Sequence, residues 1–346
     1  MSSDGNSFVT YLATHKRAID ECVLGHAPLP LSKTDQVDDL RRYLYDPLAD
    51  FVGAGGKRVR PVLCLLGAEA VGANPSVAYG IAAAVELFQA AALIHDDIAD
   101  KSSLRRGIPC LHVSQGTGLA INAGDAALVS VSSCVLNDET LDSQTRIALL
   151  KEIVDMENQT LEGQALDLGW VRDQRWDVLT SDYLAMARRK TAHYSAATPL
   201  VLGAICGGGG ESSIEGLREF GLNAGLAFQI QDDLLNLVGD AEAQGKDYRS
   251  DITEGKRTLV MMWALEHLDK PKREELIGIL SSGTTQKDLV DRAIELADEA
   301  GALDHARSYA RELTRRAKEG LRATPITEDA RQVLFSMADF FIERNA

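Results

Sequence analysis

Apolar residues recur at the spacing of an α-helix along nearly the whole of this 346-residue chain. In residues 79–93, 145–161 and 224–237, apolar side chains return every three or four positions. Strand-like alternation is almost absent, and few aromatic residues (5%) beside abundant Ala and Leu also favour helix over sheet. The glycine run at 207–210 is most simply a connection between two helices. The sequence therefore predicts an all-α fold.

The overall composition is that of one large globular domain. The chain is 45% hydrophobic and 25% charged, which excludes a disordered protein. No Pro/Ser-rich linker or low-complexity tract divides it, so we expect a single domain.

Charge and cysteine usage restrict the partners and the compartment. The net charge of −15 argues against nucleic acid and against anionic membranes as partners. The first residues show no signal peptide, and the most apolar stretch, 77–94, carries Glu86 and Gln89 and is interpreted as a buried helix, without stable membrane insertion. The cysteines are odd in number and lack CxxC spacing, so neither disulfides nor zinc are expected and a reducing cytoplasm fits. They are Cys22, Cys64, Cys110, Cys134 and Cys206.

Two short acidic motifs stand inside helix-like runs: DDIAD at 96–100 and DDLLN at 232–236. In a helix, the first and last residues of each motif lie on one face. Neighbouring carboxylates in an apolar setting are costly unless cations neutralise them. Mg²⁺ takes few protein carboxylates and completes its coordination with phosphate oxygens. The pair of motifs therefore predicts a metal-dependent site for a diphosphate.

Basic clusters flank the first acidic motif. The segment GGKRVRP at 55–61, the basic loop, precedes an apolar helical run, and Lys57 and Arg60 are placed to present two cations to one diphosphate. A solvated basic loop is the alternative if this segment is taken alone. Arg105 and Arg106 follow the motif closely, and adjacent side chains diverge, so they are expected to serve two different phosphate groups.

A third cationic set surrounds the second acidic motif. Taken singly, each lysine is best explained as a solvated surface charge. Taken together, two carboxylate helices that are each flanked by cations on an acidic chain point to a diphosphate site. The set consists of Lys190 and Thr191 upstream, Lys246 and Lys256 downstream, and Gln229 on the helical face of the motif.

These segments together resemble the trans-polyprenyl diphosphate synthases, the family of farnesyl and geranylgeranyl diphosphate synthases. The resemblance covers the chain from about residue 40 onward and implies an isoprenoid-synthase fold, a single-domain helical bundle around a central cavity. It also implies a homodimer and one polyprenyl synthetase domain over 1–346, with 1–35 as a variable N-terminal segment. The matching segments, in family order, are GGKRVRP at 55–61, LIHDDIAD at 93–100, RRGIP at 105–109, GQALD at 163–167, KTA at 190–192, FQIQDDLLN at 228–236, and Lys246 with EGKRTL at 254–259.

The resemblance assigns roles to individual residues. It implies three Mg²⁺ ions, of which Asp96 and Asp100 bind two and Asp232 binds the third. Asp97, Asp233 and Lys190 are expected to share in catalysis. The residues implied for isopentenyl diphosphate are Lys57, Arg60, Gln89 and Arg106. Those implied for the allylic diphosphate are Arg105, Lys190, Thr191, Gln229, Lys246 and Lys256.

Two positions depart from the family pattern. Gln89 stands where many members carry His, and either side chain donates hydrogen bonds to a diphosphate. Asn236 replaces the usual last Asp of the second motif, which keeps an oxygen but removes a charge. We expect Asp232 to bind metal directly and Asn236 to act without touching it.

Product length is predicted from the two helical turns before the first motif. In the family, bulk at the first of these turns stops elongation at farnesyl, whereas Ala91 and Ala92 leave it open here. Phe88 lies one turn further back and is expected to close the tunnel, which predicts geranylgeranyl diphosphate. The alternative is that Phe88 is an ordinary core aromatic.

Three rival functions stay open at this point. The first is a longer-chain synthase, in which Phe88 does not close the tunnel. The second is a non-catalytic subunit of a prenyl synthase, although such a subunit is expected to lose an acidic motif. The third is a terpene cyclase, which shares the fold but does not need the basic loop or the RRG segment.

Overall fold

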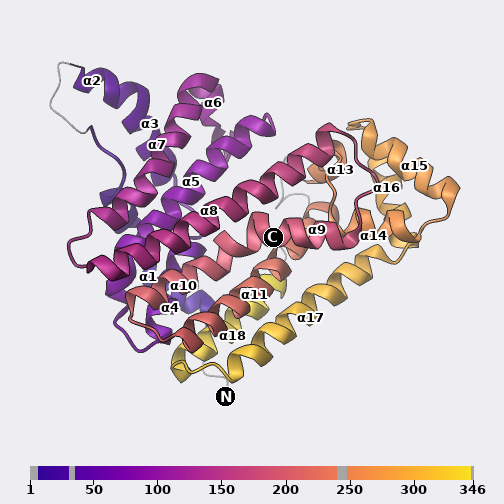
Figure 1. Cartoon of the computed structure of the whole chain (residues 1–346). Coiled ribbons are helices and arrows are strands. Elements are labelled where there is room, and N and C mark those ends of the chain that lie inside the picture. Colours follow the sequence, from indigo (N-terminus) through magenta and orange to yellow (C-terminus); the bar gives the residue numbers. More distant parts are fainter. Residues whose placement is uncertain (1–6, 31–35, 240–247, 344–346) are drawn as a thin grey trace. The chain divides into compact units, whose positions relative to one another are not determined.

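The computed structural model describes residues 7–30, 36–239 and 248–343 (Figure 1). Within these ranges every element is helical except β1 (Leu104–Arg105) and β2 (Ile108–Pro109), which pair as a small antiparallel hairpin. The predicted all-α fold is therefore confirmed. The helices group into two compact units.

The first unit contains the described residues of Met1–Val154, Pro199–Glu215 and Pro325–Val333. Its central helix is α5 (Tyr79–Ala99), which packs against α4 (Val59–Ala70) and α7 (Thr117–Leu136). Residues 81–91 of α5 are all buried, as expected for a helix that is mostly apolar on every side, and the buried stretch includes the polar residues Glu86 and Gln89. The remaining elements are α1 (Phe8–Gly25), α2 (Val37–Leu40), η2 (Arg41–Tyr45), α3 (Asp46–Gly53), η3 (Pro75–Ala78), α6 (Leu111–Ser114) and α10 (Thr198–Cys206).

The second unit contains the described residues of Asp155–Thr198, Gly216–Thr324 and Leu334–Ala346. Its core is an apolar cluster of residues between Val178 and Leu313, in which Leu259, Leu296 and Ala306 are fully buried. The elements are α9 (Thr180–Ala187), η4 (Arg188–Ala197), α13 (Ser250–Glu254), α14 (Leu259–His267), α15 (Lys270–Ser281), α16 (Lys287–Glu299) and α17 (Ala302–Arg322). Residues of both units belong to α8 (Ser143–Arg172), α11 (Glu211–Val238) and α18 (Glu328–Glu343).

Two helical segments of the described chain, Pro75–Ala99 and Thr117–Leu136, are long and apolar enough to cross a membrane. In the first, 67% of the apolar window is buried inside the protein, so the predicted buried helix is confirmed. In the second the buried share is 44%, and Ile121, Val129 and Leu136 are exposed along α7. The apolar composition of α5 is thus explained by core packing, whereas α7 keeps an uncovered apolar side.

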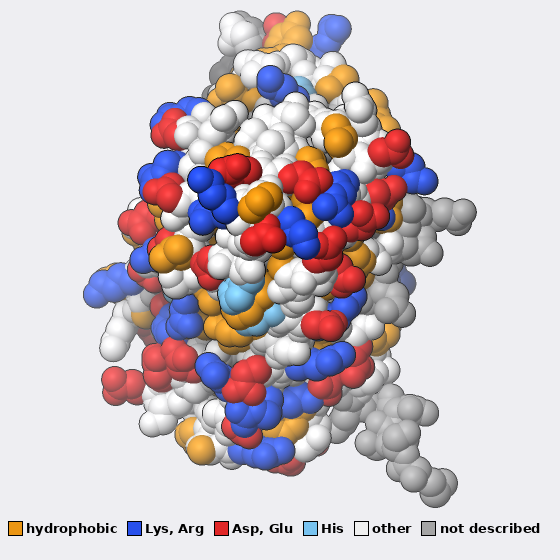
Figure 2. Space-filling view, turned by 90° about the vertical axis from the view of Figure 1, so that its right-hand side faces the viewer, with side chains coloured by type: hydrophobic (Ala, Val, Ile, Leu, Met, Phe, Trp, Pro, Cys, Tyr) orange, Lys and Arg blue, Asp and Glu red, His pale blue; other side chains and the backbone are white. Residues whose placement is uncertain are grey.

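The predicted connection at 207–210 is also observed, since α10 ends at Cys206 and α11 begins at Glu211. All five cysteines are free thiols, in agreement with the absence of a disulfide framework. On the face shown in Figure 2, acidic and basic side chains are interspersed over the surface.

Candidate active site

The first acidic motif closes the C-terminal end of α5. The backbone N–H of Asp100 donates to the carbonyl of Asp96 at 2.8 Å, so the helical turn joins the two outer residues as predicted. Asp96 is half-buried and Asp100 is exposed. Asp97 points inward, with 1% of its surface exposed, and accepts hydrogen bonds from Arg105 Nε (3.0 Å) and Nη2 (2.6 Å). The motif therefore presents its outer carboxylates and uses the middle one to hold an arginine.

The two arginines of the RRG segment diverge, as the sequence predicts. Arg105 lies on β1 and turns toward Asp97, whereas Arg106 occupies the turn of the hairpin with a positive φ of 52°. The Arg106 guanidinium lies over Gly55 and Gly56 and donates to the carbonyl of Gly55. The hairpin thus brings the RRG segment against the basic loop, although the two are about fifty residues apart in sequence.

Arg58 is the structural centre of the basic loop. It precedes α4 in the left-handed conformation, at φ 52°, and is 4% exposed. Its guanidinium donates to Asp20 Oδ1 at 2.7 Å, to Glu86 Oε1 at 2.5 Å and to the carbonyl of Val52 at 2.8 Å. Of the three cations in the loop, this one is engaged with protein acceptors on all three of its donor nitrogens.

A small pocket joins the basic loop to α5 and the hairpin. It is lined by Phe51, Val52, Arg58, Glu86, Gln89, Ala90, Leu93 and Arg106. Gln89 is 9% exposed, and its Oε1 has no hydrogen-bond partner in the described part of the chain. Lys57 is exposed and directly precedes Arg58, a residue that lines this pocket. Arg60 lies in the first turn of α4. The structure therefore brings Gln89 and Arg106 together and places Lys57 and Arg60 on the adjoining loop and helix start, where anions are favoured.

The second acidic motif lies on α11, and its middle residue is again buried. Asp233 accepts from the Tyr183 hydroxyl at 2.6 Å and from Gln229 Nε2 at 2.8 Å. The hydroxyl of Thr191 in turn donates to Gln229 Oε1 at 2.7 Å. The structure thus joins two residues that were assigned to the allylic diphosphate, Thr191 and Gln229, into one chain of hydrogen bonds that ends on Asp233.

Lys190 is held by α8. It lies in η4, a π-helical stretch of the kind that often marks functional sites. Its Nζ donates to Asp167 Oδ2 at 2.5 Å. One turn earlier on α8, a Cβ added at Gly163 would lie 2.3 Å from the backbone nitrogen of Lys190, so only glycine permits this approach. The GQALD segment is explained by these two contacts.

Asn236 connects the second acidic motif to α13. Its Nδ2 donates to Ser250 Oγ at 3.2 Å, and its Oδ1 accepts from the backbone N–H of Asp251 at 3.2 Å. The amide therefore caps the start of a neighbouring helix. That Asn236 acts without touching a metal stays a prediction.

Two further lysines were expected near this motif. Lys256 lies 2.7 Å from Glu254 Oε2 and 3.6 Å from Asp251 Oδ1. It lines the same pocket as Lys190, Thr191 and Gln229. Lys246 lies outside the described residues.

Buried carboxylates dominate the electrostatics of the second unit. Burial raises the pKa of Asp233 from 3.8 to about 8, and the charge of Asp251 adds to this. Burial also raises the pKa of Asp251, to about 6, although Lys256 opposes the shift. Since both groups line the pocket with Lys190, any further negative charge that binds there needs cations to accompany it.

The outer residues of the motifs fit Mg²⁺. Asp96, Asp100 and Asp232 offer hard oxygen ligands at partly or fully exposed positions. The first two stand at the C-terminal end of α5, where the helix dipole also favours a cation. Among the described residues, no three His, Cys, Asp or Glu side chains form a complete metal cage. Mg²⁺ does not need one, because it completes its coordination with water and phosphate.

The chain-length candidates all lie on α5. Phe88 is 4% exposed, Ala91 is fully buried and Ala92 is half-buried. Their burial suits either a tunnel wall or ordinary core packing, so the role of these residues stays a prediction.

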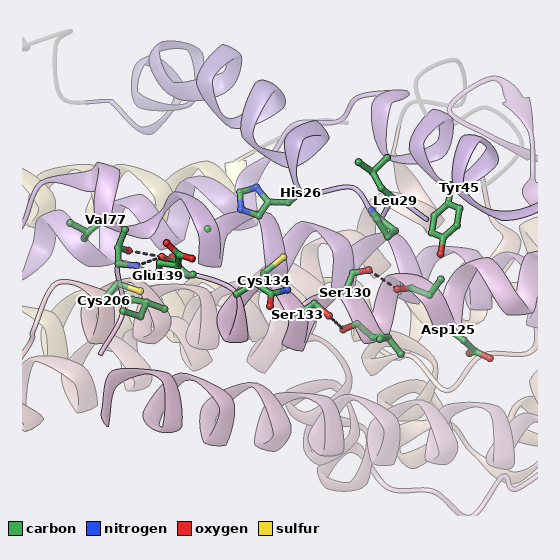
Figure 3. A pocket seen from close by; sticks show the side chains of 18 of the residues that line it. His26, Leu29, Tyr45, Val77, Asp125, Ser130, Ser133, Cys134, Glu139 and Cys206 are labelled. Carbon is green, nitrogen blue, oxygen red and sulfur yellow. Dashed lines mark hydrogen bonds between the residues drawn. The ribbon is translucent and has the colours of Figure 1, made fainter. Parts of the chain in front are cut away.

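A cavity of about 1220 Å³ in the first unit is lined by none of the predicted site residues (Figure 3). Figure 3 shows His26 and Leu29 on one side of it and Ser130 of α7 on another. Among the described residues that line it, the charged ones are Asp125, Asp138 and Glu139, and none is Lys or Arg. This acidic described lining does not suit a diphosphate.

Several residues that shape the site were not among the sequence-based candidates. Asp167 and Arg58 stand inside quoted motifs but were given no role. Glu86 was noted only as a charge within an apolar run, and nothing in the sequence marked Tyr183. Each becomes identifiable only through its partner, because the partner is distant in sequence.

Helix-borne acidic motifs with their own cationic neighbours define a class of protein that binds diphosphates through carboxylates, metal ions and basic side chains. A family model described as Polyprenyl synthetase matches residues 41–297. The chain is 44% identical over 293 residues to a short chain isoprenyl diphosphate synthase of Methanothermobacter thermautotrophicus, covering 85% of this chain and 88% of that protein. It is 34% identical over 350 residues to a geranylfarnesyl diphosphate synthase of Natronomonas pharaonis, covering 96% and 97%.

Solved structures agree. A geranylgeranyl pyrophosphate synthetase of Pyrococcus horikoshii superposes with a TM-score of 0.87 at 34% identity, over 96% of this chain and 98% of that one. A geranylgeranyl pyrophosphate synthase of Corynebacterium glutamicum, complexed with isoprenyl diphosphate and magnesium, gives a TM-score of 0.82 at 28% identity, over 99% of each chain. The chain belongs to the polyprenyl synthetase family. The predicted isoprenoid-synthase fold and the class of prenyl-transferring enzyme are thereby confirmed.

Proposed function

We propose that this protein condenses isopentenyl diphosphate with an allylic diphosphate and that its main product is geranylgeranyl diphosphate. The observation that carries the proposal is that both acidic motifs keep a metal-fitting outer carboxylate and a buried, hydrogen-bonded middle one. A subunit without catalytic activity has no need for either arrangement. The proposal treats the whole chain as one polyprenyl synthetase domain.

The residues divide into two diphosphate groups. Lys57, Arg60, Gln89 and Arg106 are proposed for isopentenyl diphosphate. Arg105, Lys190, Thr191, Gln229, Lys246 and Lys256 are proposed for the allylic diphosphate. This division is supported by the grouping of Gln89 and Arg106 in one pocket and of Lys190, Thr191, Gln229 and Lys256 in another.

The chemistry follows from charge. The bond between the allylic carbon and oxygen breaks, and its electron pair leaves with the diphosphate. The double bond of isopentenyl diphosphate then forms the new carbon–carbon bond, and a proton is lost to the departing diphosphate. Asp96, Asp100 and Asp232 would hold Mg²⁺, which would supply positive charge to neutralise the leaving group. The Arg and Lys side chains stabilise the same developing negative charge, and exclusion of water protects the cation from quenching.

We further propose that the protein is a cytoplasmic homodimer that uses three Mg²⁺ ions. The exposed apolar residues of α7 and of the adjoining part of α8 support self-association, because isolated apolar side chains are common but a row of them is not. They are Ile121, Val129, Leu136, Ile147 and Val154.

The test is incubation of the purified protein with Mg²⁺, radiolabelled isopentenyl diphosphate and, in separate reactions, dimethylallyl, geranyl and farnesyl diphosphates. Twenty-carbon products from at least one starter are expected. Longer products would instead identify a long-chain synthase, hydrocarbons would identify a cyclase, and no product from any starter would indicate a non-catalytic subunit.

A further inference from the structure

Arg58 is a cation of the basic loop to which the proposed function gives no role. It stands between Lys57 and Arg60 in the basic loop, yet it is buried and its donors are engaged with Asp20, Glu86 and the carbonyl of Val52. Such a residue cannot reach a substrate without breaking three hydrogen bonds. Its contacts instead tie the loop to α1 through Asp20 and to α5 through Glu86.

Glu86 makes this contact more than a structural brace. It is 6% exposed and lines the same small pocket as Gln89 and Arg106, close enough for its charge to act on the Arg106 guanidinium. A buried carboxylate that loses its partner attracts any cation within reach, because an unpaired buried charge is very costly. Here the cation within reach is Arg106.

We infer that Arg58 is a positioning residue for isopentenyl diphosphate: by neutralising Glu86 and anchoring the basic loop, it keeps Arg106 and Gln89 available to that substrate. This inference rests on the proposed function and assigns Arg58 no contact with either diphosphate. It acts through Arg106 and Gln89, which are proposed for isopentenyl diphosphate and not for the allylic diphosphate, so binding of the allylic substrate should change little.

The test compares Arg58→Gln, Glu86→Gln and the double variant by steady-state kinetics with each substrate varied in turn. Arg58→Gln should raise the KM for isopentenyl diphosphate by about ten- to a hundredfold, the range expected when a positioning contact is lost. The KM for the allylic substrate should change by less than about twofold. Glu86→Gln should change either KM by at most about threefold, since Arg58 keeps Asp20 and Val52.

The double variant gives the sharpest outcome. With both charges removed, Glu86 no longer draws Arg106 away, so the KM for isopentenyl diphosphate should return to within about threefold of that of Glu86→Gln. A double variant no better than Arg58→Gln would overturn the inference. So would equal rises in both KM values, or no rise in either.

Two controls separate positioning from folding. A smaller folded fraction lowers the apparent kcat and leaves both KM values unchanged, which would also overturn the inference. Arg17→Gln is the matched substitution, because Arg17 lies on α1 in an exposed pair with Glu21 and should alter neither KM. If Arg58→Gln does not fold, Arg58→Lys replaces it; one ammonium cannot serve three acceptors, so the same KM should rise and an unchanged value would contradict the inference.

Failure of the proposed function would look different. In that case the wild-type protein would make no product from any starter. If the wild type is active but Arg58→Gln does not raise the KM for isopentenyl diphosphate selectively, the proposed function stands and only the inference about Arg58 is refuted.

Discussion

The two acidic motifs bury the same residue and neutralise it in different ways. In the first, the middle carboxylate of Asp97 forms an ion pair with Arg105. In the second, the middle carboxylate of Asp233 accepts from a phenol and an amide, Tyr183 and Gln229. The two middle carboxylates are therefore both buried, but one is paired with a cation and the other with neutral donors.

The cations around the second motif are paired with other acids. Lys190 contacts Asp167, and Lys256 contacts Asp251 and Glu254. In the first unit a carboxylate of the motif itself, Asp97, holds Arg105. In the second unit, Lys190 and Lys256 are held by acidic residues outside the motif. The difference leads us to expect that the second site takes up and releases protons near neutral pH, and that the first is fixed by an ion pair.

The largest expected effect comes from the variant that tests the metal assignment of the second motif. Asp232→Ala should lower kcat/KM by roughly a thousandfold, the scale at which loss of a charge-stabilising group is felt. Asn236→Asp should stay within about threefold of wild type, because a carboxylate still accepts from the Asp251 N–H, and the Ser250 hydroxyl, which now accepts from Asn236, can donate to it instead. Steady-state turnover with saturating Mg²⁺ measures both. Equal turnover by Asp232→Ala and the wild type would refute the assignment.

The second prediction sets the two middle carboxylates against each other through stability. Asp97→Asn leaves Arg105 without its ionic partner and should lower the free energy of unfolding by about 1–3 kcal/mol at both pH 5 and pH 8.5. For Asp233, the folded pKa of about 8 lies above the ordinary value of 3.8. Between these two pKa values the folded state keeps a proton that the unfolded state releases. The free energy of unfolding therefore falls as the pH rises from 3.8 to about 8.

The Asp233→Asn side chain does not titrate in this range. The free energy of unfolding of this variant, relative to that of the wild type, should therefore rise by more than about 1 kcal/mol between pH 5 and pH 8.5. Urea unfolding in the presence of a chelator measures the change. If Asp233→Asn and Asp97→Asn show the same pH trend, the contrast between the two motifs is lost.

The third prediction tests how the second unit holds Lys190. Gly163→Ala places a Cβ against the Lys190 backbone and should cost about 1–3 kcal/mol of stability, the usual price of overpacking. It should also raise the KM for the allylic diphosphate about tenfold while the KM for isopentenyl diphosphate is unchanged.

Gly169→Ala is the matched control, because it lies on the same helix with nothing within 4 Å of the added Cβ. It should be neutral or stabilising by up to about 1 kcal/mol, as alanine favours helix. Thermal unfolding and substrate-varied kinetics distinguish the two variants. A Gly163→Ala variant that behaves like Gly169→Ala would show that the close approach is unimportant.

Sequence patterns predicted the parts of this site that depend on local geometry. Helical periodicity predicted α5 and α11, and the i, i+4 spacing predicted that Asp96 and Asp100 share a helical turn. The contacts that distinguish the two motifs join residues 8 to 50 positions apart, such as Arg105 to Asp97 and Tyr183 to Asp233. No periodicity encodes such pairs, because they depend on how separate helices pack.

The last prediction expects almost no change in rate, but a change in the length of the product. Phe88 lies two turns before Asp96 on α5 and is 4% exposed, so Phe88→Ala would open space on the helix of the first motif only. If this side chain closes the tunnel, the variant should turn over at about the wild-type rate but extend products by one or more five-carbon units, since one helical turn spans about 5.4 Å. Product chromatography after exhaustive reaction measures chain length. Ala92→Phe should have the opposite effect and give a shorter product. Unchanged products from Phe88→Ala beside a loss of stability would show that Phe88 only packs, and the role of the first motif would then be confined to metal and diphosphate binding, like that of the second.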